Sequence, residues 1–97
     1  METAQWQDAA AQLRREIRAY LEQRGASLSE AVRTYPTPIA RCDEQLPALL
    51  ESRREALQLL EASDATLVAA FAAAAARWDD PAALSLVAKA RQVSAAR

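Results

Sequence analysis

Alanine occupies 25 of the 97 positions, whereas glycine occurs once. Alanine is the best helix former because its side chain loses no rotamer entropy in a helix. A β-sheet needs turn glycines and strands rich in Val, Ile and Thr, and the chain has only four Val, two Ile and four Thr. The sequence therefore predicts an all-α fold.

Large apolar side chains are scarce, with twelve Leu, two Trp and one Phe. Alanine buries little area, so it adds little hydrophobic free energy. A chain of this length supports one modest core. We therefore predict a single domain over residues 1–97, built as a small, thinly cored bundle of three to four helices.

The apolar spacing predicts long helices over 3–24, 44–62, 64–78 and 81–94. In the first, Trp6, Ala10, Leu13, Ile17 and Tyr20 are spaced 4, 3, 4 and 3, which is typical of a helix packed lengthwise on another. Arg18 and Glu22 are four residues apart and can form a weak ion pair. Gly25 follows directly and suits the left-handed position after a helix end.

The segment between the first two long helices is the least regular. Ser27 and Glu30 form a capping box, which predicts a short helix over 28–33. Pro36 and Pro38 disfavour helical geometry in the residues before them. We therefore expect 34–43 to be an irregular, proline-containing crossover.

Start signals mark the later helices. Asp43 can cap the second helix, and Pro47 is tolerable only in its first turn. The third should begin after Ser63 or Asp64, and the fourth has Asp80 as its N-cap with Pro81 at the first helical position. Their short connections predict antiparallel neighbours.

The residue types argue against an enzyme. Histidine is absent, and a single Cys and a single Gly cannot provide a zinc cage or a phosphate-binding loop. The acidic pairs Asp43–Glu44 and Asp79–Asp80 stand at helix starts, where acids interact favourably with the helix dipole. We therefore expect no catalytic residue, no metal and no cofactor.

Several features favour a cytoplasmic setting without a membrane span. The lone Cys42 cannot form an intramolecular disulfide, and the opening residues are neither basic nor apolar as in a secretory signal. The longest uncharged run, 65–76, is shorter than the roughly 20 residues that span a bilayer.

One alternative function is nucleic-acid binding. Arg14, Arg15 and Arg18 cluster on the first helix, and the chain carries no acid from Pro81 onward. Phosphate contacts require such groups. However, four acids balance four arginines through residue 24, and the net charge is −1. Nucleic acid is therefore the less favoured partner.

The 34–43 loop is a second candidate. Tyr35, Ile39, Arg41 and Asp43 could contact a partner, since loops on a rigid scaffold often carry function. Cys42 lies beside Arg41, which could lower its pKa and support an enzymatic or redox role. The alternative is a stiff connection whose apolar side chains close one end of the bundle.

The uncharged run 65–76 is the third candidate. A helix that is apolar all round is usually covered on most sides, and a small bundle covers it poorly. We therefore expect a partner helix or a second copy to contact Leu67, Val68, Phe71 and Trp78. The leading interpretation is a non-enzymatic protein-interaction or structural module, either a homodimer or an adaptor subunit.

Overall fold

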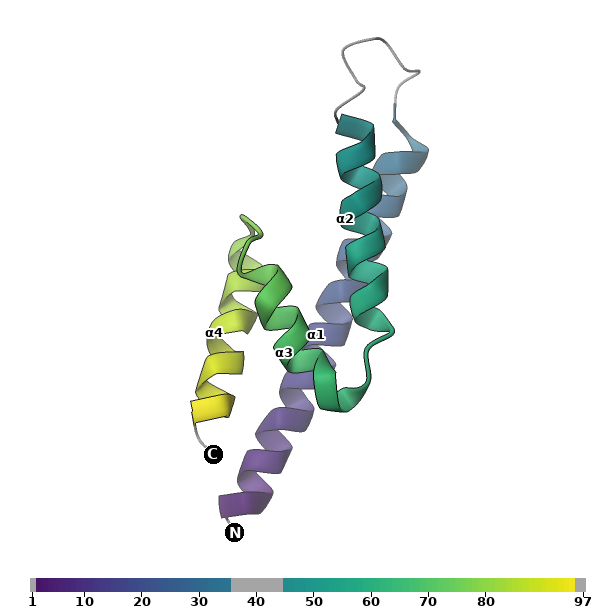
Figure 1. Ribbon diagram of the computed structural model, residues 1–97. Helices are drawn as coiled ribbons and strands as arrows, with labels where there is room; N and C mark the ends of the chain where they lie inside the picture. Colours follow the sequence, from purple (N-terminus) through teal and green to yellow (C-terminus); the bar gives the residue numbers. More distant parts are fainter. Residues whose placement is uncertain (1, 36–44, 96–97) are drawn as a thin grey trace.

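The computed structural model describes residues 2–35 and 45–95, which form four α-helices and no strand. Their bounds are Glu2–Arg33 (α1), Gln45–Leu60 (α2), Asp64–Ala75 (α3) and Pro81–Ala95 (α4). The chain direction alternates from each helix to the next (Figure 1). The all-α bundle with antiparallel neighbours is therefore confirmed. None of these helices combines the length and apolarity needed to cross a bilayer.

The bundle is elongated because α1 is much longer than its partners. Its 32 residues span about 48 Å at 1.5 Å per residue. The molecule measures 59 × 18 × 18 Å with a radius of gyration of 15.8 Å, against about 13 Å for a compact domain of this length. The C-terminal part of α1 and the antiparallel α2 project beyond α3 and α4 (Figure 1). We call this projection, residues 22–33 and 45–60, the arm.

The core lies where all four helices meet, at the middle of α1 and the base of the arm. Four large side chains there are essentially inaccessible to solvent: Ile17, Leu21, Leu67 and Phe71. The remaining buried core residues are smaller or less central, and half of the whole set are alanines or valines: Ala10, Leu13, Ala56, Leu59, Ala74, Ala75, Ala83, Leu86, Val87 and Ala90. The thin core expected from the composition is present.

The expected break at Gly25 is wrong. α1 continues through it, so neither the helix end near 24 nor the separate capped helix over 28–33 occurs. Gly25 has no positive φ and is buried within α1. A Cβ on Gly25 would lie 3.8 Å from Leu57 Cδ2 of α2. Packing of α2 along this stretch stabilises a continuous helix, which outweighs the roughly 1 kcal/mol helix penalty of one glycine.

Replacing Gly25 with alanine is expected to stabilise the protein. The added methyl group would make an ordinary van der Waals contact with Leu57, and alanine is better than glycine in a helix interior by about 0.5–1 kcal/mol. Thermal unfolding should show a midpoint about 2–8 °C higher. A lower midpoint would indicate that residue 25 adopts a left-handed conformation, which a continuous α1 excludes.

The second, third and fourth helices start within a residue of their predicted positions. Asp80 caps α4 by accepting a hydrogen bond from the Ala82 N–H at 3.0 Å, and Pro81 is the first helical residue as predicted. α3 ends at Ala75 rather than at 78. Its last turn tightens, with the Trp78 N–H donating to the Ala75 carbonyl at 3.0 Å, and this turn brings Trp78 back over α1.

Candidate functional site

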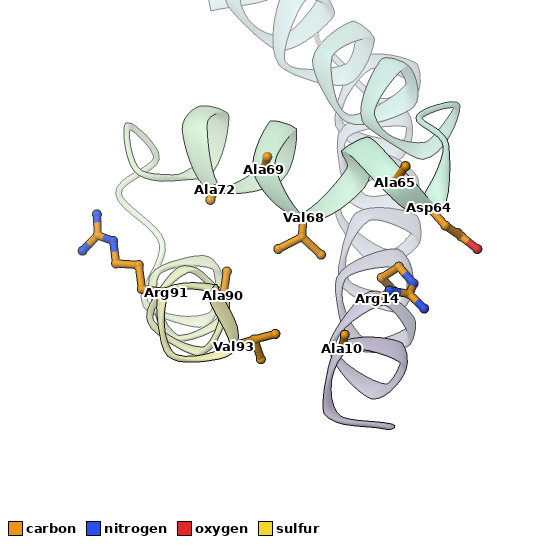
Figure 2. Close-up of a pocket in the computed structure, with 10 residues that line it drawn as sticks. All are labelled: Ala10, Arg14, Asp64, Ala65, Val68, Ala69, Ala72, Ala90, Arg91 and Val93. Carbon is orange, nitrogen blue, oxygen red and sulfur yellow. The ribbon is translucent and has the colours of Figure 1, made fainter. Parts of the chain in front are cut away.

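A groove of about 460 Å³ lies between α1, α3 and α4. Val68 and Val93 point into it from α3 and α4, and Ala10 faces it from α1 (Figure 2). The rest of its floor consists of small side chains, namely Ala65, Ala69, Ala72 and Ala90. Such a floor lets another backbone approach closely.

The charged groups of the groove stand at its rims. Arg14 lies at the α1 side beside Asp64, and Arg91 lies at the α4 side (Figure 2). Asp64 already forms an ion pair, because a guanidinium nitrogen of Arg18 lies 2.7 Å from its Oδ1 atom. This hydrogen bond is the main reason that the pKa of Asp64 is lowered, with the Arg14 charge contributing least. Among the described residues, Arg14 and Arg91 make no ion pair or hydrogen bond, so the groove carries excess positive charge.

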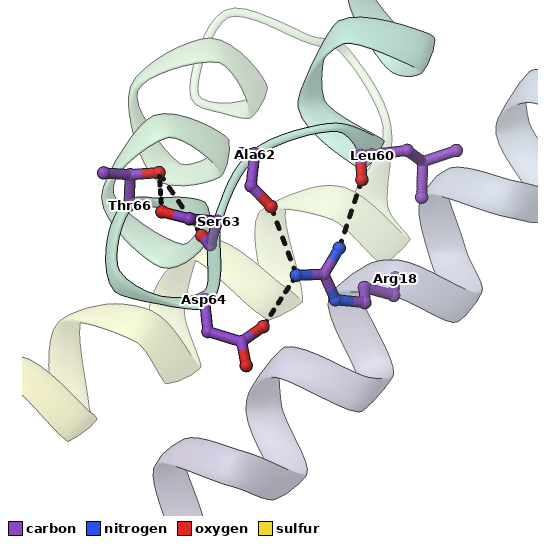
Figure 3. Close-up of polar contacts among 6 residues, drawn as sticks. All are labelled: Arg18, Leu60, Ala62, Ser63, Asp64 and Thr66. Atoms are coloured by element: carbon purple, nitrogen blue, oxygen red, sulfur yellow. Dashed lines mark hydrogen bonds and ion pairs between the residues drawn. The ribbon is translucent and has the colours of Figure 1, made fainter.

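Arg18 joins α1 to the connection between α2 and α3 (Figure 3). Its guanidinium donates to the Leu60 and Ala62 carbonyls, each at 3.2 Å, and to Asp64. α2 has no basic residue in its own last turn, so Arg18 supplies the cation that a helix C-terminus favours. The expected weak pair of Arg18 with Glu22 is not what the structure shows.

The predicted contact residues of α3 divide into two groups. Leu67 and Phe71 have no exposed surface, so they pack within this chain. Val68 is half-buried and lines the groove. The exposed part of α3 therefore consists mostly of alanine, including Ala65, Ala69 and Ala73.

Trp78 belongs to an aromatic cluster with Tyr20 and Phe71, in which ring centroids lie 5.9–6.3 Å apart. Arg24 lies over the indole at 4.1 Å from the ring centroid, within the range of a cation–π interaction. The indole N–H donates to Glu55 of α2 at 2.8 Å. Trp78 therefore joins the α3–α4 turn to α1 and α2, which is a structural role.

The Tyr20 hydroxyl donates a hydrogen bond to Asp80, the N-cap of α4. Burial is the main reason that the pKa of Tyr20 is raised, followed by the bond to Asp80. The same bond is the main reason that the pKa of Asp80 is lowered. Both groups therefore keep their ordinary protonation states near neutral pH, and the pair has the properties of a structural link.

The 34–43 loop lies almost entirely outside the described residues, so Ile39, Arg41, Cys42 and Asp43 cannot be placed. Tyr35, at the end of α1, is half-buried. Its hydroxyl donates to Gln45 Oε1 at 3.2 Å, which connects the two helices of the arm. The interpretation of the loop as a contact site or a stiff connection stays a prediction.

Sequence reasoning missed a partly exposed leucine surface on the arm. Leu50 and Leu57 lie seven residues apart on α2, with 42% and 44% of their surfaces exposed. They line a shallow hollow of about 380 Å³ together with Arg53, Arg54, Gln58 and Glu61. The available signal was the seven-residue spacing of Leu50 and Leu57 within the predicted helix. We call Leu50, Arg53, Arg54, Leu57, Gln58 and Glu61 the leucine face.

The arginines proposed for nucleic acid are partly engaged. Arg18 binds the α2–α3 connection, and Arg15 donates to Gln12 at 2.6 Å. On α4, Lys89 pairs with Glu16 of α1 at 3.3 Å. Within residues 2–35 and 45–95, these contacts leave few free cations on any one surface, whereas phosphate recognition requires several.

Within residues 2–35 and 45–95, no three Cys, Asp or Glu side chains gather in a way that could hold a metal ion. Comparisons with protein-family models, curated proteins and solved structures found no match. Two surfaces of the molecule are therefore the candidates for a binding function, the leucine face and the α1–α3–α4 groove.

Proposed function

We propose that this protein is a helical interaction module that pairs with a second copy of itself through the arm. The observation that carries the proposal is the exposure of Leu50 and Leu57 on one face of α2. Two large apolar side chains one heptad apart, on a projecting hairpin, are typical of a helix that packs against another helix.

The arm also lacks a closed core of its own. Its other large aliphatic side chains beyond the base are only half-buried, namely Leu28, Val32, Leu46 and Leu49. A two-helix hairpin can cover one face of each helix only, whereas two hairpins together provide the four helices of a bundle. A second arm would therefore cover the apolar surface that the first leaves open.

The charges beside the leucine face favour a second copy over a strongly charged partner. Arg53 and Arg54 are matched in number by Glu51 of α2 and by Glu61, which directly follows that helix. Because a twofold interface brings the same surface of both subunits together, a surface of mixed sign can complement itself. A purely basic or purely acidic surface would repel its copy.

Leu50→Glu and Leu57→Glu are expected to weaken self-association at least tenfold, because each change places two charges in the paired face. Leu50 and Leu57 keep 42% and 44% of their surfaces exposed within one chain, so the variants should fold. The measurement is light scattering after size-exclusion chromatography over a range of micromolar concentrations, with circular dichroism to verify helix content.

The matched control is Leu84→Glu on α4, since Leu84 is 42% exposed, as Leu50 is. This variant should keep the wild-type mass at every concentration. Equal effects of all three substitutions would contradict a specific role for the arm.

A further inference from the structure

We infer that the groove between α1, α3 and α4 binds an amphipathic helix of a partner protein, with acidic residues flanking the apolar face of that helix. The inference does not depend on pairing through the arm, because residues of α1, α3 and α4 line the groove, whereas the leucine face lies on α2 and the residue that follows it. It follows from the shape of the groove and from the charges at its rims.

The shape favours a helix as the occupant. α1, α3 and α4 border the groove (Figure 2), so a fourth helix lying in it would complete a four-helix arrangement. Alanine residues from all three helices form most of the floor, and small residues allow close helix approach. Larger side chains of the incoming helix would fill the space beside Val68 and Val93.

The distribution of polar groups argues against a small molecule. Small-molecule sites place a few polar groups so that they converge on the ligand. Here the floor is apolar, and Arg14 and Arg91 stand on opposite rims, where they do not converge (Figure 2). An apolar floor with a charge on each side matches an amphipathic helix whose apolar face has charged flanks.

The positive charges at the rims of the groove favour an incoming helix with acidic residues beside its apolar face. Asp64 is bound by Arg18, whereas neither Arg14 nor Arg91 forms an ion pair among the described residues. Carboxylates at the edges of the incoming helix would pair with both guanidinium groups. Basic flanks would bring like charges together, which disfavours binding.

The probes are fluorescein-labelled 21-residue helical peptides with a Leu/Ala face flanked by glutamates, synthesised in several glutamate registers. Their controls carry lysine in place of every glutamate. At least one acidic peptide should bind at least tenfold more tightly than its lysine control in fluorescence anisotropy. Binding should weaken with salt, and amide signals of Ala65, Val68 and Ala69 should shift in NMR spectra.

Four variants locate the site and separate it from the arm. The double charge reversal R14E/R91E should exchange the preference, so that the lysine peptide binds more tightly. Ala69→Phe should abolish binding by filling the exposed floor, whereas Arg15→Glu, beside the groove on α1, should retain at least half of the wild-type affinity. Leu50→Glu should bind as the wild type does, which separates this test from that of the arm.

Equal binding of acidic and lysine peptides, absence of binding in every register, or an unchanged preference in R14E/R91E would each overturn the inference. Loss of wild-type self-association in R14E/R91E would also overturn it, because it would assign the groove to a second copy of the chain.

Discussion

Phe71→Ala should lower the free energy of unfolding by about 3–5 kcal/mol, the usual range for truncating a buried phenylalanine. Phe71 has no exposed surface. Its ring meets Tyr20 and Trp78 edge-on, with centroids 6.0 and 5.9 Å away. Half of the buried core residues are alanine or valine, so few side chains can move in to fill the cavity. The measurement is urea denaturation followed by circular dichroism.

The matched control for Phe71→Ala is Ala73→Ser, two residues along the same helix at an exposed position. It should change the free energy of unfolding by no more than about 0.5 kcal/mol. A loss below about 1.5 kcal/mol for Phe71→Ala would mean that the aromatic cluster is not the centre of the core.

Arg18→Ala should cost about 2 kcal/mol of stability. The substitution removes charge-assisted hydrogen bonds to the Leu60 and Ala62 carbonyls, and bonds from a charged donor are worth about 1.5–3 kcal/mol. It also removes the only cation that the structure places at the end of α2 among the described residues. Chemical denaturation measures the loss.

Two companion variants separate the contributions to this effect. Asp64→Asn keeps both carbonyl contacts of Arg18 and should cost clearly less than Arg18→Ala. Arg15→Ala removes a surface arginine that bonds only Gln12, so stability should change by about 0.5 kcal/mol or less. Equal losses for Arg18→Ala and Arg15→Ala would contradict the linking role of Arg18.

Local signals in the sequence predicted much of the fold. The caps at Asp80 and before Asp64, the prolines and the alanine content placed three helix starts to within a residue. These signals act over a few residues. Gly25 misled the prediction because its role depends on α2, more than twenty residues away, and local propensity cannot report that contact.

Contacts between residues far apart in the sequence also decide which of the predicted contact residues are exposed. Leu67 and Phe71 lie on the predicted apolar helix, but the structure turns them inward, so Val68 is the one large side chain of that run left at the groove. Leu50 and Leu57 had the correct heptad spacing, yet periodicity alone does not say whether a leucine faces its own chain or another. The partner of Arg18 is separated from it by 46 residues.

Sedimentation equilibrium of the wild-type protein at 10–100 μM is the most direct test of pairing through the arm. We predict a mass that rises with concentration to twice the 10.6 kDa of one chain, and a single-chain mass for Leu50→Glu under the same conditions. A single-chain mass for the wild type throughout this range would contradict the proposed function.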